Sequence, residues 1–111
     1  MFNIDVSIYI ASRTRWVHLV KRIRLPAVPR AGEHIKLRNA RVGDYFSFAV
    51  SHVTYHEYGT IEVATELLDN INGRMYSFDD EPEFDEYYSS YLGEGWTSPH
   101  GITPNRRASS A

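Results

Sequence analysis

Residues 25–37 read LPAVPRAGEHIKL, and this stretch decides how the strands on either side of it are arranged. Pro26 and Pro29 fix the backbone φ angle and remove two N–H donors, so the segment cannot be a central strand of a sheet. Gly32 permits a turn that a side chain would resist, and the alternation over residues 34–37 then indicates a new strand. A crossing held by two prolines in this way is typical of a corner between the sheets of a small barrel.

Two long alternating runs precede this crossing. Residues 2–11 carry an apolar side chain at every second position, and residues 15–25 resume the same period after a short polar break. A period of two is that of a half-buried strand, so both runs are predicted to be strands joined as a hairpin. Lys21 falls on the apolar face of the second run, which predicts a bulge or the rim of a barrel at that position.

Three more strands are predicted after the crossing, over residues 34–38, 45–56 and 60–68. The apolar series of residues 45–56 changes phase near His52, and a one-residue slip moves side chains to the opposite face, so we expect a bulge there. Together the five strands predict a mainly β fold, either a five-stranded barrel or a curled antiparallel sheet. The positions expected to form its core are Ile4, Val6, Ile8, Leu19, Ile23, Phe46, Phe48, Ile61 and Val63.

The period changes from that of strands to that of a helix after residue 68. A short extended piece is expected over residues 75–78, and aromatic side chains at helical spacing predict a short acidic helix over residues 81–92. We expect residues 1–94 to form one domain that includes this helix. Residues 95–111 contain two prolines and a polar end, and they are expected to be a flexible tail.

The order of these elements resembles SH3-like small β-barrel domains of bacterial and phage type. The stretch RAGEHIKL, residues 30–37, is similar to the glycine, acid and apolar residue with which a strand of such barrels begins. The resemblance covers residues 2–68 and implies the barrel fold for them. SH3-like barrels are used for peptide binding, nucleic-acid binding and assembly contacts, so the resemblance implies no single function.

Composition and motifs exclude several classes of chemistry. The 111 residues include no cysteine, so neither a disulfide nor a thiolate nucleophile can form, and no run is long enough to span a membrane; we expect a soluble, cytoplasmic protein. His52 and His56 are four apart on a predicted strand, which separates their Cα atoms by about 13 Å, too far to share one metal ion. Without a nucleophile elbow or a phosphate loop, we expect no enzyme, no catalytic residue, no cofactor and no metal.

The charges divide the chain into a basic and an acidic half. Residues 1–60 hold nine Lys and Arg against four Asp and Glu, a net +5, and residues 61–111 hold three against ten, a net −7. Clustered carboxylates beside tyrosines favour docking on a basic protein surface. The leading hypothesis is therefore a non-enzymatic protein-binding module, of inhibitor or immunity type, that uses Asp79, Asp80, Glu81, Glu83, Asp85, Glu86, Tyr87, Tyr88 and Tyr91.

An alternative site lies on the second strand, where basic residues alternate with an aromatic one. Phosphate pairing together with base stacking is how single-stranded nucleic acid is bound, which makes this face a candidate nucleic-acid surface. Its residues are Arg13, Arg15, Trp16, His18, Arg22 and Arg24. The competing interpretation is that the acidic helix covers Trp16 and pairs with these arginines. A third hypothesis is a homo-oligomer that self-associates through an unpaired strand edge.

Overall fold

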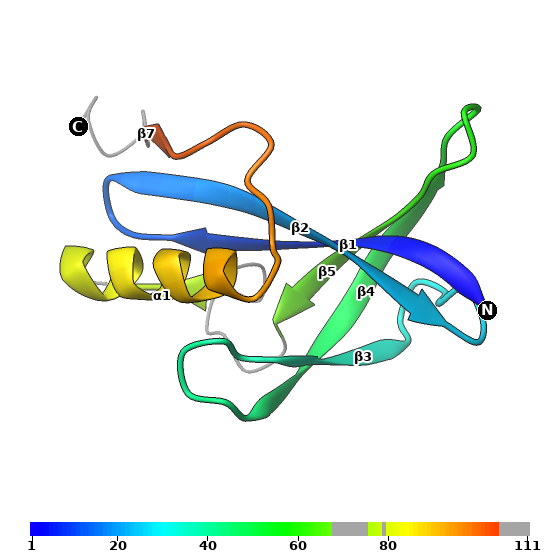
Figure 1. Cartoon of the computed structure of the whole chain (residues 1–111), viewed down its shortest axis with the longest axis horizontal. Coiled ribbons are helices and arrows are strands. Elements are labelled where there is room, and N and C mark those ends of the chain that lie inside the picture. Colours follow the sequence, from blue (N-terminus) through cyan, green and yellow to red (C-terminus); the bar gives the residue numbers. More distant parts are fainter. Residues whose placement is uncertain (68–75, 79, 105–111) are drawn as a thin grey trace.

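The computed structural model describes residues 1–67, 76–78 and 80–104, and within them the fold is mainly β with one short helix (Figure 1). The five long alternating runs and the helix lie within about one residue of their predicted bounds, which confirms those predictions. In chain order the elements are β1 (Phe2–Ala11), β2 (Arg15–Leu25), β3 (His34–Arg38), β4 (Tyr45–Tyr55), β5 (Ile61–Leu67), β6 (Tyr76–Ser77), α1 (Glu81–Gly93) and β7 (Thr103–Pro104).

The strands form one curled sheet in the order β3-β4-β5-β1-β2-β7, with β6 paired to β1 beyond the end of β5. β1 and β2 form an unbroken antiparallel hairpin, whereas β5 pairs with β1 in parallel, with Val63 opposite Val6. The expected antiparallel sheet is therefore wrong, and the sheet is mixed and not closed into a barrel. Alternation reveals which residues form strands, but it does not give the direction in which two strands pair, so it could not reveal the parallel pairing of β5 with β1.

Two expected irregularities have different outcomes. The register of β4 against β5 shifts between Val50 and His52, which confirms the predicted bulge. At Lys21 the pairing with β1 continues without a shift, so the bulge predicted there is wrong. Instead, the half-buried Lys21 side chain lies on the inner face of β2, at the next inward position after the fully buried Leu19.

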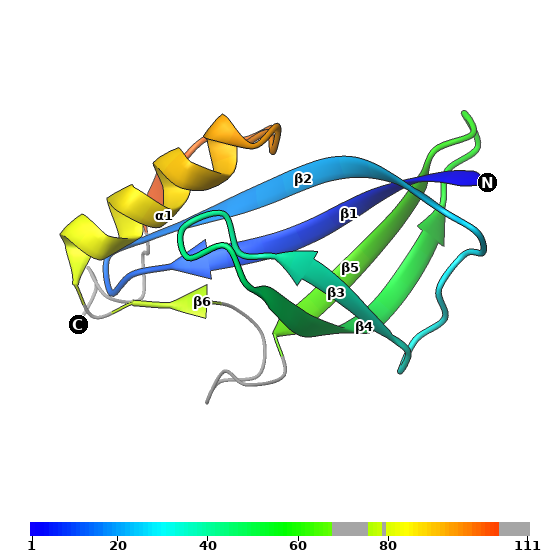
Figure 2. The ribbon, with the colours of Figure 1, turned by 60° about the horizontal axis from the view of Figure 1, so that its bottom comes forward.

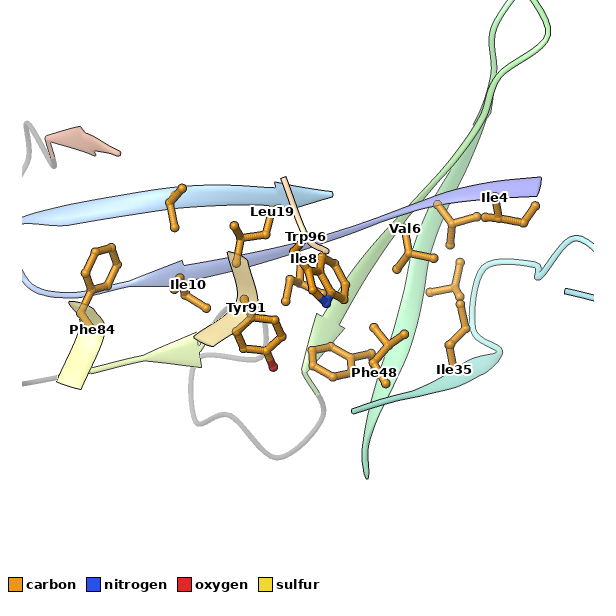
Figure 3. Close-up of a cluster of buried hydrophobic side chains, with 14 residues drawn as sticks. Ile4, Val6, Ile8, Ile10, Leu19, Ile35, Phe48, Phe84, Tyr91 and Trp96 are labelled. Carbon is orange, nitrogen blue, oxygen red and sulfur yellow. The ribbon is translucent and has the colours of Figure 1, made fainter. Parts of the chain in front are cut away.

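The core fills the concave face of the sheet (Figure 3). Six of the nine predicted core residues are buried, and the other three, Ile23, Phe46 and Ile61, are half-buried around the edge of the cluster. Phe84 and Tyr91 of α1 add two large, fully buried rings to the end of the core that lies over Ile10 and the hairpin. They are seven residues apart, about two helical turns, so both project from the face of α1 that meets the sheet.

The chain beyond α1 packs against the domain, contrary to the expected flexible tail. Trp96 is only 4% exposed and meets the ring of Tyr91 edge-on, with 5.5 Å between the ring centroids. The next residue, Thr97, exchanges two backbone hydrogen bonds with Val20, and β7 pairs with the start of β2. The flexible-tail prediction is thus wrong for residues 96–104, whereas residues 105–111 lie outside the described part of the chain. Figure 2 shows α1 on one side of the β1–β2 hairpin.

Candidate functional site

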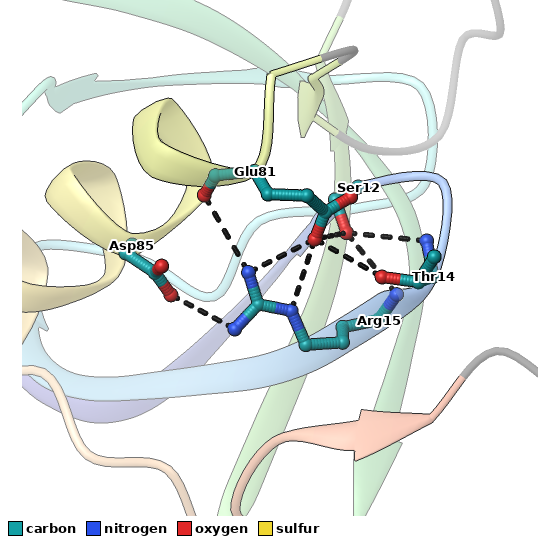
Figure 4. A network of polar contacts seen from close by, with 5 residues as sticks. All are labelled: Ser12, Thr14, Arg15, Glu81 and Asp85. Carbon is teal, nitrogen blue, oxygen red and sulfur yellow. Dashed lines mark hydrogen bonds and ion pairs between the residues drawn. The ribbon is translucent and has the colours of Figure 1, made fainter.

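The acidic residues at the start of α1 are engaged by the tip of the β1–β2 hairpin (Figure 4). Arg15 donates from Nη2 to Oε1 of Glu81 at 2.9 Å and from Nη1 to Oδ1 of Asp85 at 2.9 Å. The same Glu81 oxygen accepts hydrogen bonds from the hydroxyls of Ser12 at 2.8 Å and Thr14 at 3.0 Å. The Arg15 guanidinium also lies 4.6 Å from the centre of the Phe84 ring, in cation–π geometry.

These contacts favour the charged form of each partner. The pKa of Glu81 is lowered, chiefly by the hydrogen bond from Ser12 and then by those from Arg15 and Thr14. The pKa of Arg15 is raised, chiefly by its hydrogen bond to Asp85. The network therefore fastens the helix to the hairpin most firmly when Glu81 is ionised.

Of the other helix residues predicted to bind a partner, most make contacts within the chain, and a few near the N-terminus of α1 are exposed. Glu86 pairs with Arg41 at 3.0 Å, and the exposed carboxylates of Asp80 and Glu83 have no partner among the described residues. Tyr91 is buried, while Tyr87 and Tyr88 are half-buried against the core. Asp79 lies outside the described residues. Most of the proposed acidic docking surface is thus committed to contacts within the chain.

The basic face of β2 is divided between the two sides of the strand. Arg15 faces α1, and by alternation Trp16 and His18 lie on the opposite side. The expectation that the helix covers Trp16 is therefore wrong. Tyr9 of β1 stacks on His18 with 4.8 Å between ring centroids and lies 6.3 Å from the ring of Trp16. His100 lies beyond His18, with their ring centroids 6.1 Å apart.

Burial is the main cause of the pKa shifts of the stacked residues His18 and Tyr9. It lowers the pKa of His18, with Glu62 acting in the opposite direction and His100 adding to the decrease. Burial likewise raises the pKa of Tyr9, and Glu62 raises it further. The Nε2 atom of His18 is enclosed and has no hydrogen-bond partner among the described residues. A neutral His18 inside an aromatic stack is a poor ligand for phosphate.

The remaining arginines of the predicted nucleic-acid face are dispersed. Arg22 donates to both carboxylate oxygens of Asp5, at 2.8 and 3.2 Å, and this raises the pKa of Arg22. Arg24 is exposed near the end of β2, and Arg13 is exposed at the hairpin tip. The structure therefore does not bring the six predicted residues together as one basic surface.

A groove lies where the two ends of the sheet face one another, between β2 and β3. One hollow of about 610 Å³ runs along the proline crossing and the first half of β3, and it is lined by Leu25, Pro26, Ala27, Val28, Pro29, Glu33, His34, Ile35 and Lys36. A second, of about 260 Å³, is lined by Lys21, Ile23, Lys36, Leu37, Arg38, Tyr45, Glu94 and Trp96. Lys36 borders both hollows, so we describe them together as the β2–β3 groove.

The β3 side of this groove is a free strand edge. At one end of β3, the Val50 N–H donates to the Glu33 carbonyl at 2.8 Å, and at the other the Asn39 N–H donates to the Asp44 carbonyl at 2.7 Å. Backbone groups alternate in direction along a strand, so every second residue from Glu33 to Asn39 points toward β4. The residues between them, which direct their N–H and C=O groups away from β4, are His34, Lys36 and Arg38.

The β2 side of the groove presents a second free edge. Val20 directs its backbone groups to Thr97, so Arg22 and Arg24 direct theirs to the same side, away from β1. No backbone hydrogen bond between the described residues reaches the outward backbone groups of Arg22 and Arg24, or those of the three outward-directed β3 residues. The groove therefore exposes backbone donors and acceptors along both of its sides.

The groove has an apolar floor, and basic side chains lie along its sides. Its floor consists of the inward-facing residues Ile23, Leu25, Ile35 and Leu37. Arg38 forms an ion pair with Glu94, the residue that follows α1. Lys21 and Lys36 have no carboxylate partner among the described residues. The sequence did suggest an unpaired edge, but the groove depends on two ends of a sheet coming face to face, which only the tertiary structure shows.

Comparison with protein-family models, curated proteins and solved structures finds no match to this chain. Within the residues that the structure describes, no three His, Asp or Glu side chains converge as metal ligands. The described part of the chain likewise contains no helix with the length and apolar character needed to cross a membrane. We take the β2–β3 groove as the candidate site because it combines an apolar floor with outward-directed backbone groups.

Proposed function

We propose that this protein is a non-enzymatic protein-binding module that takes up an extended segment of another protein as an added strand on β3. The observation that carries the proposal is the free edge formed by His34, Lys36 and Arg38 beside an open, apolar-floored groove. Strand addition of this kind obtains affinity from main-chain hydrogen bonds and specificity from the pockets that receive alternate side chains.

The groove supplies both of these elements. Three residues at every second position direct backbone groups outward, which matches the repeat of an extended partner strand. The hollows that flank Lys36 provide about 610 and 260 Å³ for the partner's side chains.

The site proposed here replaces the acidic helix of the leading hypothesis. Glu81 and Asp85 are held by Arg15, and Glu86 by Arg41, so a partner would have to displace ion pairs already made. Displacing an existing pair offsets much of what a new pair contributes. A strand added to β3 displaces no backbone hydrogen bond between described residues.

Two substitutions of Lys36 test the proposal, because they separate the contribution of its backbone N–H to binding from that of its side chain. A proline at an outward-pointing edge position removes one donor and leaves the β3–β4 hydrogen bonds in place, whereas alanine removes only the side chain. The probe is a ten-residue peptide selected against the intact chain from a random displayed library. We expect Lys36→Pro to bind this peptide roughly tenfold more weakly than Lys36→Ala, the loss that corresponds to about one hydrogen bond.

Thermal unfolding of both variants shows whether each is folded before binding is compared. Equal affinity of the two folded variants for the selected peptide would contradict strand addition on β3. Failure of the library to yield any peptide that binds the intact chain would contradict the proposed function as a whole.

A further inference from the structure

We propose that the segment taken up by the β2–β3 groove is acidic, with apolar residues facing the groove floor and carboxylates facing outward at the alternate positions. This inference rests on the proposed function and specifies the partner for the same site. It follows from the alternation of a strand and from the side chains that would flank each position.

The inward positions of an added strand would meet apolar surface. Along β3 the inward side chains are Ile35 and Leu37, and at the facing end of β2 they are Ile23 and Leu25. The last two are only half-buried, so the core is incompletely covered at this place. An apolar side chain at every second position of the segment would complete that cover and remove apolar area from water.

The outward positions would meet positive charge. The exposed side chains of β3 are those of His34, Lys36 and Arg38, and Arg24 is exposed on the outer face of β2. Neighbouring side chains on one face of a sheet lie close enough for opposite charges to attract and for like charges to repel. Carboxylates at these positions would therefore be favoured over both neutral and basic side chains.

The acids that already line the groove are engaged within the chain. Glu94 pairs with Arg38, and the Glu33 carboxylate accepts the Arg30 backbone N–H at 2.6 Å. Lys21 and Lys36 are left without a carboxylate among the described residues. The Glu94–Arg38 pair also shows that this end of the groove accommodates a carboxylate, because the chain places one there itself.

A second copy of this chain fits the same groove poorly. Pairing of two β3 edges would bring the histidine, lysine and arginine of one copy against those of the other. Lysine on an edge strand is a common device against such edge-to-edge association. The charge of the groove therefore favours an acidic partner over a homo-oligomer.

Three matched peptides test this inference on the intact chain. Each has ten residues that alternate valine with glutamate, glutamine or lysine, and binding is measured by isothermal titration at low and at high salt. We expect the glutamate peptide to bind at least about tenfold more tightly than the glutamine peptide at low salt. The difference should shrink at high salt because ions screen exposed charges. The variant that combines Arg24→Glu with Lys36→Glu reverses two of the outward-facing charges and should prefer the lysine peptide.

The outcomes separate this inference from the proposed function. Equal binding of the glutamate and glutamine peptides would overturn the acidic partner and leave strand addition intact. If neither these peptides nor any library peptide binds, the proposed function fails. A concentration-dependent dimer of the intact chain that Lys36→Pro abolishes would replace the acidic partner with a second copy. If the charge-reversed variant does not fold, the comparison of peptides and salts on the unaltered chain decides the matter.

Discussion

The guanidinium of Arg15 and the carboxylate of Glu81 lie 2.9 Å apart, joining the hairpin tip to the first turn of the only helix in the described chain. Glu81 stands at the helix N-terminus, where a negative charge is also favoured by the helix dipole. Oε1 of Glu81 accepts hydrogen bonds from Arg15, Ser12 and Thr14. The sequence placed Arg15 and Glu81 on different candidate surfaces, and the fold joins them as a structural fastening.

Loss of this fastening should lower stability more than loss of a simple surface pair. Arg15→Ala removes the bonds to Glu81 and Asp85 together with the contact over Phe84, whereas Arg22→Ala removes only the pair with Asp5. We expect the urea midpoint to fall clearly for Arg15→Ala and little for Arg22→Ala. Equal effects of the two substitutions would contradict the structural role of the network.

The contribution of Glu81 should depend on pH. Its pKa is lowered in the folded chain, so its ionised form is the stabilising one. Stability from Glu81 is fully present above the ordinary glutamate value of about 4.3 and is lost as the pH falls through the lower, folded value. Glu81→Gln should therefore be less stable than the unaltered chain at pH 7, and the two should converge in acid. A constant difference between pH 7 and pH 3 would contradict this prediction.

His18 should also make stability depend on pH, and at a higher value. Because burial lowers its pKa, the unfolded chain binds more protons than the folded chain just below the ordinary value of about 6.5. Stability should therefore decrease as the pH falls from 7.5 to 5.5, and part of this decrease should be absent in His18→Phe, which keeps a ring beside Tyr9. Urea titrations at the two pH values measure it, and identical pH dependence of variant and unaltered chain would contradict it.

The segment after α1 should stabilise the domain. Trp96→Ala should cost about 3–5 kcal/mol of unfolding free energy, because it empties a buried site beside Tyr91. Ile8→Ala, at the centre of the sheet, should cost about 2–5 kcal/mol and serves as the reference. Denaturant unfolding measures both. A Trp96→Ala variant as stable as the unaltered chain would mean that residues 96–104 do not belong to the domain.

Oligonucleotide binding should be absent or weak in the intact chain. Arg15 and Arg22 are paired within the chain, and Trp16 lies half-buried beside Tyr9, so phosphate and base contacts are not presented together. Fluorescence anisotropy of a labelled single strand at low salt tests this, with the Arg22→Glu, Arg24→Glu variant as control. Tight binding that salt weakens and the variant abolishes would favour the nucleic-acid hypothesis instead.

Alternation along the sequence was sufficient to predict the five long strands and most of the core. It identified β1, β2 and the bulge near His52, because each depends on which face a side chain occupies. It could not give the parallel pairing of β5 with β1, since the pattern of a strand carries no direction. Trp96 was missed because a single aromatic residue among glycines and prolines has no period to reveal it.

The site was harder to predict than the fold. Charge clusters along the sequence indicated an acidic helix and a basic strand, yet charges of opposite sign that meet in the fold neutralise each other, as Arg15 and Asp85 do. The groove instead combines β2 and β3 with Glu94, which follows them by more than fifty residues. Such a combination depends on tertiary contacts that local patterns do not contain.

Residue-resolved amide hydrogen exchange, followed by NMR, tests the strand-addition claim most directly because it requires no substitution. In the free chain, the amides of Ile35 and Leu37 should exchange slowly, since they point toward β4, and those of His34, Lys36 and Arg38 should exchange quickly. On saturation with the selected peptide, the three fast amides should become protected, in alternation with residues already slow. Protection that appears on α1 while these three amides remain fast would contradict the account.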